Sequence, residues 1–118
     1  MALHEIDADL KTAEAVLHHW ESKYPKIARD EATAKVEHEL AWANAIDKIV
    51  TESDGGKLPT VAVMEAEATK RCAGTLRAKR EAEAEADIAK KLIGIAETTL
   101  TSIQTRVKLE VIKKGLSN

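Results

Sequence analysis

The sequence predicts an all-α protein: a helical hairpin with one long helix, coiled-coil-like apolar seams and association into an oligomer, for which a ring is one arrangement. Three observations predict this class. The composition is typical of long helices, with 32% charged residues, 3% aromatic residues, five Gly and two Pro in 118 residues. Apolar residues recur at alternating intervals of three and four. Gly55, Gly56 and Pro59 lie close together and mark one clear turn, and the length indicates one domain, residues 1–118.

The first predicted helix covers residues 3–24. Its apolar residues lie on one face in an unbroken heptad pattern, and early acidic residues such as Asp7 and Asp9 suit the positive end of a helix dipole. This seam consists of Leu3, Ile6, Leu10, Ala13, Leu17, Trp20 and Tyr24.

Pro25 predicts an end or a kink of that helix, because its ring removes a backbone donor and disfavours helical geometry at Tyr24. It can equally serve as the first residue of a second helix, expected over residues 26–52. The apolar face of this second helix is expected to consist of Ile27, Ala32, Val36, Leu40, Ala43, Ile46 and Val50. The paired glycines Gly55-Gly56 and Pro59 then predict a turn over residues 53–59.

A third helix is expected over residues 60–114, with Thr60 as its N-cap. It contains no proline, and we expect one long element, although a break at Gly74 or Gly94 is left open. Residues 77–87 include no large apolar side chain. That stretch is either a solvated spacer or an Ala-lined site where helices approach closely. The seam of this helix includes Ile93, Leu100, Ile103 and Val107, which we assign to an oligomer interface.

Charge divides the chain into two parts. Residues 1–69 hold 7 Lys or Arg and 14 Asp or Glu, a net charge of −7, whereas residues 70–118 hold 11 and 6, a net charge of +5. The strongest basic cluster has no acidic residue within it and could follow a phosphate backbone. It consists of Lys70, Arg71, Arg77, Lys79 and Arg80, of which Lys70, Arg77 and Arg80, spaced by seven and three residues, fall on one face of the expected helix. The alternative is that these side chains pair with the acidic half, and charge alone does not separate the two.

Catalytic and metal-binding patterns are not visible in the sequence. The four His residues have no ligand spacing, and Asp54-Gly55-Gly56-Lys57 lacks the spacing and the following Ser or Thr of a phosphate loop. Cys72 lies on the apolar seam and is expected to be a buried thiol. We therefore expect no enzyme activity, no cofactor and no metal. No stretch approaches the length of a membrane span, so a cytoplasmic location without membrane binding is expected.

Two short segments resemble the UvsY-type phage recombination mediators. Leu17-His-His-Trp20-Glu-Ser-Lys23-Tyr24 is similar to the Trp-x-x-Lys segment that ends the first helix of that family. Residues 95–106, Ile-Ala-Glu-Thr-Thr-Leu-Thr-Ser-Ile-Gln-Thr-Arg, resemble its final helix with a Leu-x-x-Ile-x-x-Arg pattern. A Gly/Asp-rich turn at residues 53–57 follows a second helix at similar spacing. The resemblance covers roughly residues 13–115.

The resemblance implies a helical homo-oligomer that binds single-stranded DNA. Such a protein loads a RecA-like recombinase onto DNA covered by single-strand-binding protein, inside a bacterial host cell if the chain is phage-encoded. The family carries a Lys-x-Arg pair before its turn, but the matching residues 42–45 are neutral here and only Lys48 is near. The expected DNA-binding residues are therefore the basic cluster with Lys48 and Arg106. Should the cluster instead pair with acids, the site moves to Arg106, Lys108, Lys113 and Lys114.

A second hypothesis belongs to another functional class. The chain would be a structural or inhibitory helical protein that docks its apolar seam on a partner protein. Titration with a labelled oligonucleotide separates the two hypotheses, because only the first requires phosphate contacts.

Overall fold

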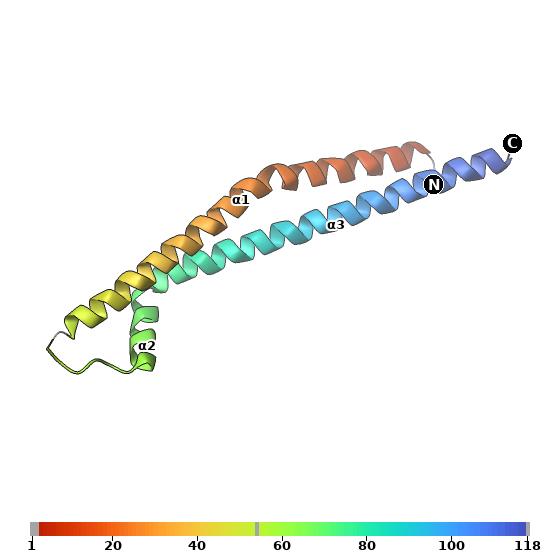
Figure 1. Ribbon diagram of the computed structural model, residues 1–118. Coiled ribbons are helices and arrows are strands. Elements are labelled where there is room, and N and C mark those ends of the chain that lie inside the picture. The colour runs from red at the N-terminus through yellow and green to blue at the C-terminus, as the bar shows by residue number, and fades with distance from the viewer. Residues whose placement is uncertain (1–2, 54, 118) are drawn as a thin grey trace. The chain divides into compact units, whose positions relative to one another are not determined.

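A computed structural model describes residues 3–53 and 55–117, without the side chains of residues 3, 116 and 117. Three helices follow one another along the chain: α1 (Leu3–Glu52), α2 (Val61–Arg71) and α3 (Ala73–Ser117) (Figure 1). None of the described residues forms a strand. The predicted all-α class, a helical hairpin with a long helix, is confirmed.

The contacts between residues group into two compact units. The first, here called the terminal unit, consists of Met1–Pro25 and Asp87–Asn118. The second, here called the turn unit, consists of Lys26–Ala86. Both units contain one part of α1 and one part of α3, and α2 belongs to the turn unit.

The terminal unit is an antiparallel pair of helical segments, the start of α1 beside the end of α3 (Figure 1). Its core is formed by Ile6, Ala13 and Ile103, and Leu10, Leu100 and Val107 pack against it. The predicted seam of residues 6–24 is correct for the described side chains, because every member is buried or half-buried. The side chain of Leu3 lies outside the described part.

The turn unit has a core to which α2 contributes. Ala45 and Ile49 from α1 lie against Ala68 and Cys72, and partly buried Trp42, Ile46 and Met64 surround them. Cys72 is 4% exposed and unpaired, which confirms the prediction of a buried thiol. α2 runs at a sharp angle to α3 (Figure 1), so its short apolar face covers the end of α1.

Pro25 does not end a helix. α1 is 50 residues long and continues through Pro25, so the expected boundary between residues 24 and 26 was wrong. A proline inside a helix leaves the carbonyl four residues earlier without its backbone donor. Here that carbonyl belongs to Glu21, and both Glu21 and Pro25 are exposed, so water can replace the lost donor. Packing of α1 on either side of Pro25 then maintains the helix.

The apolar face predicted for residues 26–52 was wrong at five of its seven positions, whereas Ile27 is buried and Ile46 is half-buried, as predicted. Val36 is 53% exposed and Leu40 is 60% exposed, and Ala32, Ala43 and Val50 are exposed as well. Because α1 is continuous, its heptad pattern does not restart at Pro25 but runs on from Tyr24. The positions that face the interior are Ile27, Glu31, Ala34, His38, Ala41, Ala45 and Ile49, all buried or half-buried. Two of these seven positions are polar, which hid the register in the sequence.

The predicted turn is present at residues 53–59, of which Asp54 lies outside the described residues. The Ser53 N–H donates to the carbonyls of Ile49 and Val50 at 3.2 Å, and the Gly56 N–H donates to the Ser53 carbonyl at 2.8 Å. Gly55 has φ +77°, a left-handed conformation that glycine adopts without steric cost. The predicted N-cap is confirmed, because the Thr60 side chain accepts the Val63 N–H at 3.3 Å.

The single long helix expected over residues 60–114 is divided in two. α2 ends at Arg71 and α3 begins at Ala73, with Cys72 as the junction. The change of direction there lets Ala68 and Cys72 face the same core as Ile49. The weak helix propensity of nearby Gly74 lowers the cost of this break. Gly94, the other candidate for a break, lies inside α3.

The alanine-rich stretch after Arg77 does not form a solvated spacer. Ala86 and Ala89 have no exposed surface at all, and Ala82 is half-buried. Methyl side chains on the inner face of α3 allow close approach of a neighbouring helix, which is the second of the two alternatives open from the sequence.

Candidate nucleic-acid interface

The predicted basic cluster is distributed over two helices. Lys70 and Arg71 end α2, whereas Arg77, Lys79 and Arg80 lie in the second and third turns of α3. The sequence placed Lys70, Arg77 and Arg80 on one face of one helix, and the break at Cys72 overturns that part of the prediction. All five residues belong to the turn unit.

Arg71 has a structural role. Its guanidinium forms a fork with the Glu52 carboxylate, at 2.8 Å from Nη2 to Oε2 and 3.3 Å from Nη1 to Oε1. Its Nε donates to Glu67 Oε1 at 3.1 Å. Hydrogen bonds from Arg71 hold the pKa of Glu52 below its ordinary value, and those to Glu52 and Glu67 raise the pKa of Arg71. Arg71 therefore joins the last turn of α1 to α2, and we no longer expect it to bind phosphate.

The other four members of the cluster are less constrained. Lys79 is half-buried and forms a loose pair with Glu83, at 3.9 Å from Nζ to Oε1. Lys70, Arg77 and Arg80 are exposed, and no ion pair with another described residue engages them. Pairing with the acidic half thus accounts for Arg71 but not for these three. They are the positive charges of the cluster that a polyanion could neutralise.

The remaining candidate cations lie in different places. Lys48 is exposed on α1 in the turn unit, and its positive charge contributes to the lowered pKa of Glu52. Arg106 lies in the terminal unit, where its Nη2 is 3.9 Å from Asp9 Oδ2. Near the end of α3, Lys113 approaches Glu110 at 3.7 Å. The terminal unit also carries exposed cations that form no ion pair with a described residue, namely Lys90, Lys91, Lys108 and Lys114.

Aromatic side chains offer few platforms for stacking bases. Trp42 packs against the core of the turn unit. Trp20 is half-buried, with the His19 ring edge-on at 5.3 Å and the Lys23 ammonium 6.0 Å from its ring centre. Tyr24 is half-buried as well. Any contact of these helices with a nucleic acid would therefore depend on phosphate contacts more than on base stacking.

One polar contact inside the turn unit was not predicted. His38 Nδ1 lies 3.1 Å from Thr75 Oγ1, and the Thr75 hydroxyl donates to the Cys72 carbonyl at 3.1 Å. Since that hydroxyl has one hydrogen, His38 is the donor of the first bond. The contact connects α1 to the junction of α2 and α3. The heptad pattern that continues from Ile27 includes His38, and this position was the feature of the sequence that could have predicted an inward-facing His38.

The residues assigned to an oligomer interface are used inside one chain. Ile103 is 3% exposed and shares a core with Ile6, while Leu100 and Val107 pack against that core. Ile93 is half-buried and lies beside Tyr24 in a shallow hollow. A heptad pattern shows that a helix packs along one face, but it does not say whether the partner helix belongs to the same chain.

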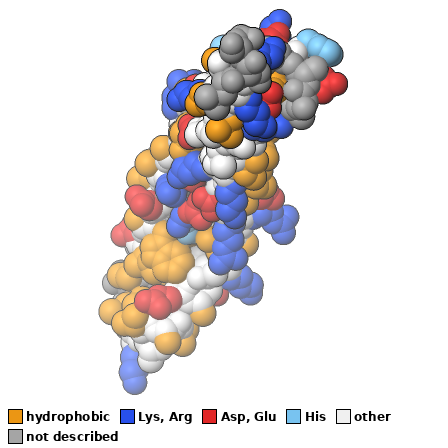
Figure 2. Space-filling model, turned by 90° about the vertical axis from the view of Figure 1, so that its right-hand side faces the viewer, with side chains coloured by type: hydrophobic (Ala, Val, Ile, Leu, Met, Phe, Trp, Pro, Cys, Tyr) orange, Lys and Arg blue, Asp and Glu red, His pale blue; other side chains and the backbone are white. Residues whose placement is uncertain are grey.

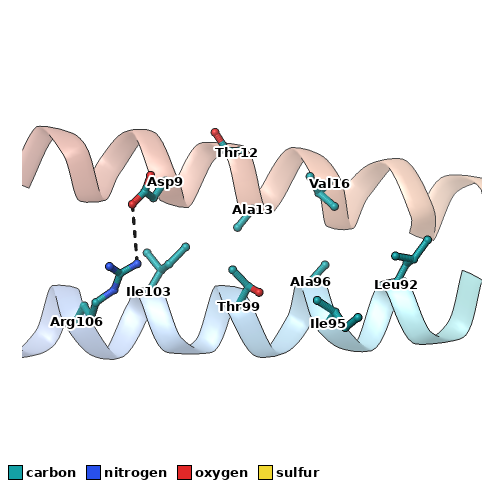
Figure 3. A pocket seen from close by; sticks show the side chains of 10 residues that line it. All are labelled: Asp9, Thr12, Ala13, Val16, Leu92, Ile95, Ala96, Thr99, Ile103 and Arg106. Carbon is teal, nitrogen blue, oxygen red and sulfur yellow. Dashed lines mark ion pairs between the residues drawn. The ribbon is translucent and has the colours of Figure 1, made fainter.

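A groove of about 390 Å³ remains open between α1 and α3 of the terminal unit (Figure 3). Ala13 and Ile103 form its base, and Val16, Leu92 and Ile95 give it apolar walls. Ile95 is 62% exposed. The Asp9–Arg106 ion pair lies at one end (Figure 3). The groove was missed in the sequence because Val16 and Ile95 lie next to the seam, not on it.

The described residues contain no group of three or more His, Cys, Asp and Glu side chains that could hold a metal ion. Over the same part of the chain, none of the helices combines the length and the apolar character needed to cross a membrane. No protein-family model matches the chain, and no curated protein and no solved structure matches it either. The resemblance to UvsY-type mediators stays a prediction.

Proposed function

We propose that this protein binds single-stranded DNA through the turn unit. The observation that carries the proposal is the contrast within the basic cluster. Arg71 is held by two carboxylates, whereas Lys70, Arg77 and Arg80 are exposed and form no ion pair with described residues. Lysine and arginine side chains in this state can replace the counterions of a phosphate backbone.

The proposed contact is electrostatic and independent of base sequence. Few aromatic side chains are exposed for stacking, so affinity would depend on the number of phosphates that each molecule contacts. Three cations on one chain bind weakly, but linked copies gain avidity because the second contact becomes intramolecular. Association of several chains would therefore strengthen binding without any new type of contact.

The test compares two triple variants by fluorescence anisotropy with a labelled oligonucleotide over a range of salt concentrations. Lys70→Ala/Arg77→Ala/Arg80→Ala should weaken binding and lower the slope of log affinity against log salt by about 0.7 per lost contact. Lys26→Ala/Arg29→Ala/Lys57→Ala removes the same charge from exposed residues of the turn unit outside the cluster and should change both quantities much less. Equal effects of the two variants would show that net charge, not this cluster, governs binding.

The role as a recombination mediator rests on the resemblance of residues 17–24 and 95–106. Its test is the loading of a RecA-like recombinase onto DNA covered by single-strand-binding protein, followed through the DNA-dependent ATPase of the recombinase. The protein should shorten the delay before ATP hydrolysis begins, and the cluster variant should not. DNA binding without this effect would support the proposed DNA interface but contradict the role as a mediator.

The alternative function, docking of a helical protein on a partner protein, is favoured by a separate observation. Val36 and Leu40 form an exposed apolar stripe on α1, opposite to its buried face, and exposed hydrophobic side chains appear between charged ones in Figure 2. Exposed apolar patches are typical of protein contacts. Failure of the oligonucleotide titration, together with loss of partner binding in Leu40→Asp, would favour this function.

A further inference from the structure

The groove of the terminal unit has the properties of an unfinished helical bundle. Two helical segments pack along one seam, and a second set of apolar side chains lies beside it. On α3 this second set is Ile88, Leu92 and Ile95, spaced by four and three residues, and Val16 lies across the groove on α1. Ile88, Ile95 and Val16 are exposed. Apolar side chains at this spacing next to an occupied seam are typical of helices that contact more than one other helix.

The charges of the two segments favour a second copy as the occupant. Residues 3–25 hold two Lys against five Asp or Glu, a net charge of −3. Residues 87–117 hold six Lys or Arg against three Asp or Glu, a net charge of +3. The groove thus lies between an acidic helical segment and a basic helical segment. A face of this kind is complementary to itself when each acidic helix lies opposite the basic helix of the other copy.

We propose that two copies of this chain associate through this groove into a four-helix bundle, related by a two-fold axis parallel to the helices. This axis places α1 of one copy against α3 of the other, and every neighbouring pair of helices is antiparallel. A two-fold axis perpendicular to the helices would instead put acidic segment against acidic segment. Charge therefore selects the first arrangement.

The register of the dimer follows from the ion pair within one chain. Asp9 and Arg106 lie at the same level, 3.9 Å apart between Oδ2 and Nη2. Rotation about an axis parallel to the helices preserves levels, so Arg106 of one copy comes near Asp9 of the other. Seven residues further along α1 and seven residues back along α3, Val16 and Thr99 also share a level. Both line the groove (Figure 3).

The area of the proposed interface sets the expected affinity of the dimer. From Ile88 to Arg106, α3 rises about 27 Å at 1.5 Å per residue, and two helix diameters of about 10 Å each give a footprint of roughly 500 Å² per copy. Specific interfaces bury about 600–1,000 Å² per partner. The dimer is therefore a modest one, with a dissociation constant on the order of micromolar.

The first test is sedimentation equilibrium of the full chain between about 1 and 100 μM, a range that brackets the expected constant. The wild-type protein should approach twice its 12.9 kDa mass at the upper end. Ile95→Asp should remain monomeric, because it puts an unpaired charge into the groove. Val36→Asp, an exposed aliphatic residue of the turn unit, should dimerise as the wild type does. Unchanged helix content by circular dichroism confirms that both variants fold.

The second test reads the arrangement itself. In a Cys72→Ala background, chains with Val16→Cys are mixed with chains with Thr99→Cys and oxidised. The mixture should form disulfide-linked dimers, and either chain alone should form few. A wild-type protein that stays monomeric at the highest concentration would overturn the proposal, as would Val36→Asp dissociating it while Ile95→Asp does not. Efficient disulfide formation between two Val16→Cys chains would contradict the proposed orientation of the two-fold axis. None of these readouts involves DNA, so they are independent of the nucleic-acid titration.

Discussion

The terminal unit and the turn unit are both formed from segments of α1 and α3, but they close their cores differently. In the turn unit a third segment, α2, covers the apolar face of α1, and Ala68 at that contact has no exposed surface. The terminal unit has two segments only, and Ile95 beside its core stays 62% exposed. A pair of helices can bury one seam between them, but a second apolar row needs another helix. The comparison therefore points to the apolar row beside the core of the terminal unit as the place where the proposed second copy would pack.

The two tryptophans allow each unit to be followed by itself. Trp20 belongs to the terminal unit and Trp42 to the turn unit, where it packs against the core. Replacing one of them by Phe leaves the other as the reporter of its own unit. The predictions below use these single-tryptophan backgrounds in chemical denaturation.

The largest effect is expected for Ile103→Ala in the terminal unit. Ile103 is buried with Ile6 and Ala13, so the change removes buried apolar atoms and leaves a cavity. The free energy of unfolding should fall by about 2–5 kcal/mol, seen by Trp20. Ile112→Ala removes the same atoms from an exposed position of the same helix and should change stability by less than about 0.5 kcal/mol. Equal losses for the two variants would mean that the two-helix core contributes little.

A smaller effect is expected for Ala68→Leu in the turn unit. The added atoms have no space between α2 and α1, so the free energy of unfolding should fall by about 1–3 kcal/mol, seen by Trp42. Ala66→Leu, on the exposed side of α2, is the matched control and should be nearly neutral. If Trp42 reports no difference between the variants, α2 does not close this core tightly.

The smallest effect concerns the Glu52–Arg71 fork and acid pH. The hydrogen bond from Arg71 lowers the pKa of Glu52 on folding. A carboxylate with a lowered folded pKa stabilises the protein above its unfolded pKa of about 4.3, and this stabilisation is lost as the pH falls through the folded pKa. In Glu52→Gln, the free energy of unfolding followed by Trp42 should therefore fall less steeply with decreasing pH below about pH 4.3. Glu39→Gln, on the exposed surface of α1, should keep the wild-type profile.

Some features of the candidate site could be predicted from the sequence, and others became visible only in the structure. The charge pattern identified the basic cluster, but the sequence could not tell that Arg71 meets Glu52, since the two are 19 residues apart and the contact needs the turn and α2. The groove beside Ile95 was equally hidden, because exposure depends on how many helices surround a residue. Helix formation is a local property, whereas the identity of a neighbour is not.

The sequence alone determined that the chain is helical, where its one glycine-rich turn lies and that Thr60 caps the helix after it. These features depend on propensities and hydrogen bonds within a few residues. Only the tertiary structure decided that α1 runs through Pro25, that Ala34 and His38 face inward while Leu40 faces outward, and that Cys72 separates α2 from α3. The physical reason is that packing energy over a long helix outweighs one missing hydrogen bond. A helix with apolar residues on two sides can be oriented only by the partner it meets.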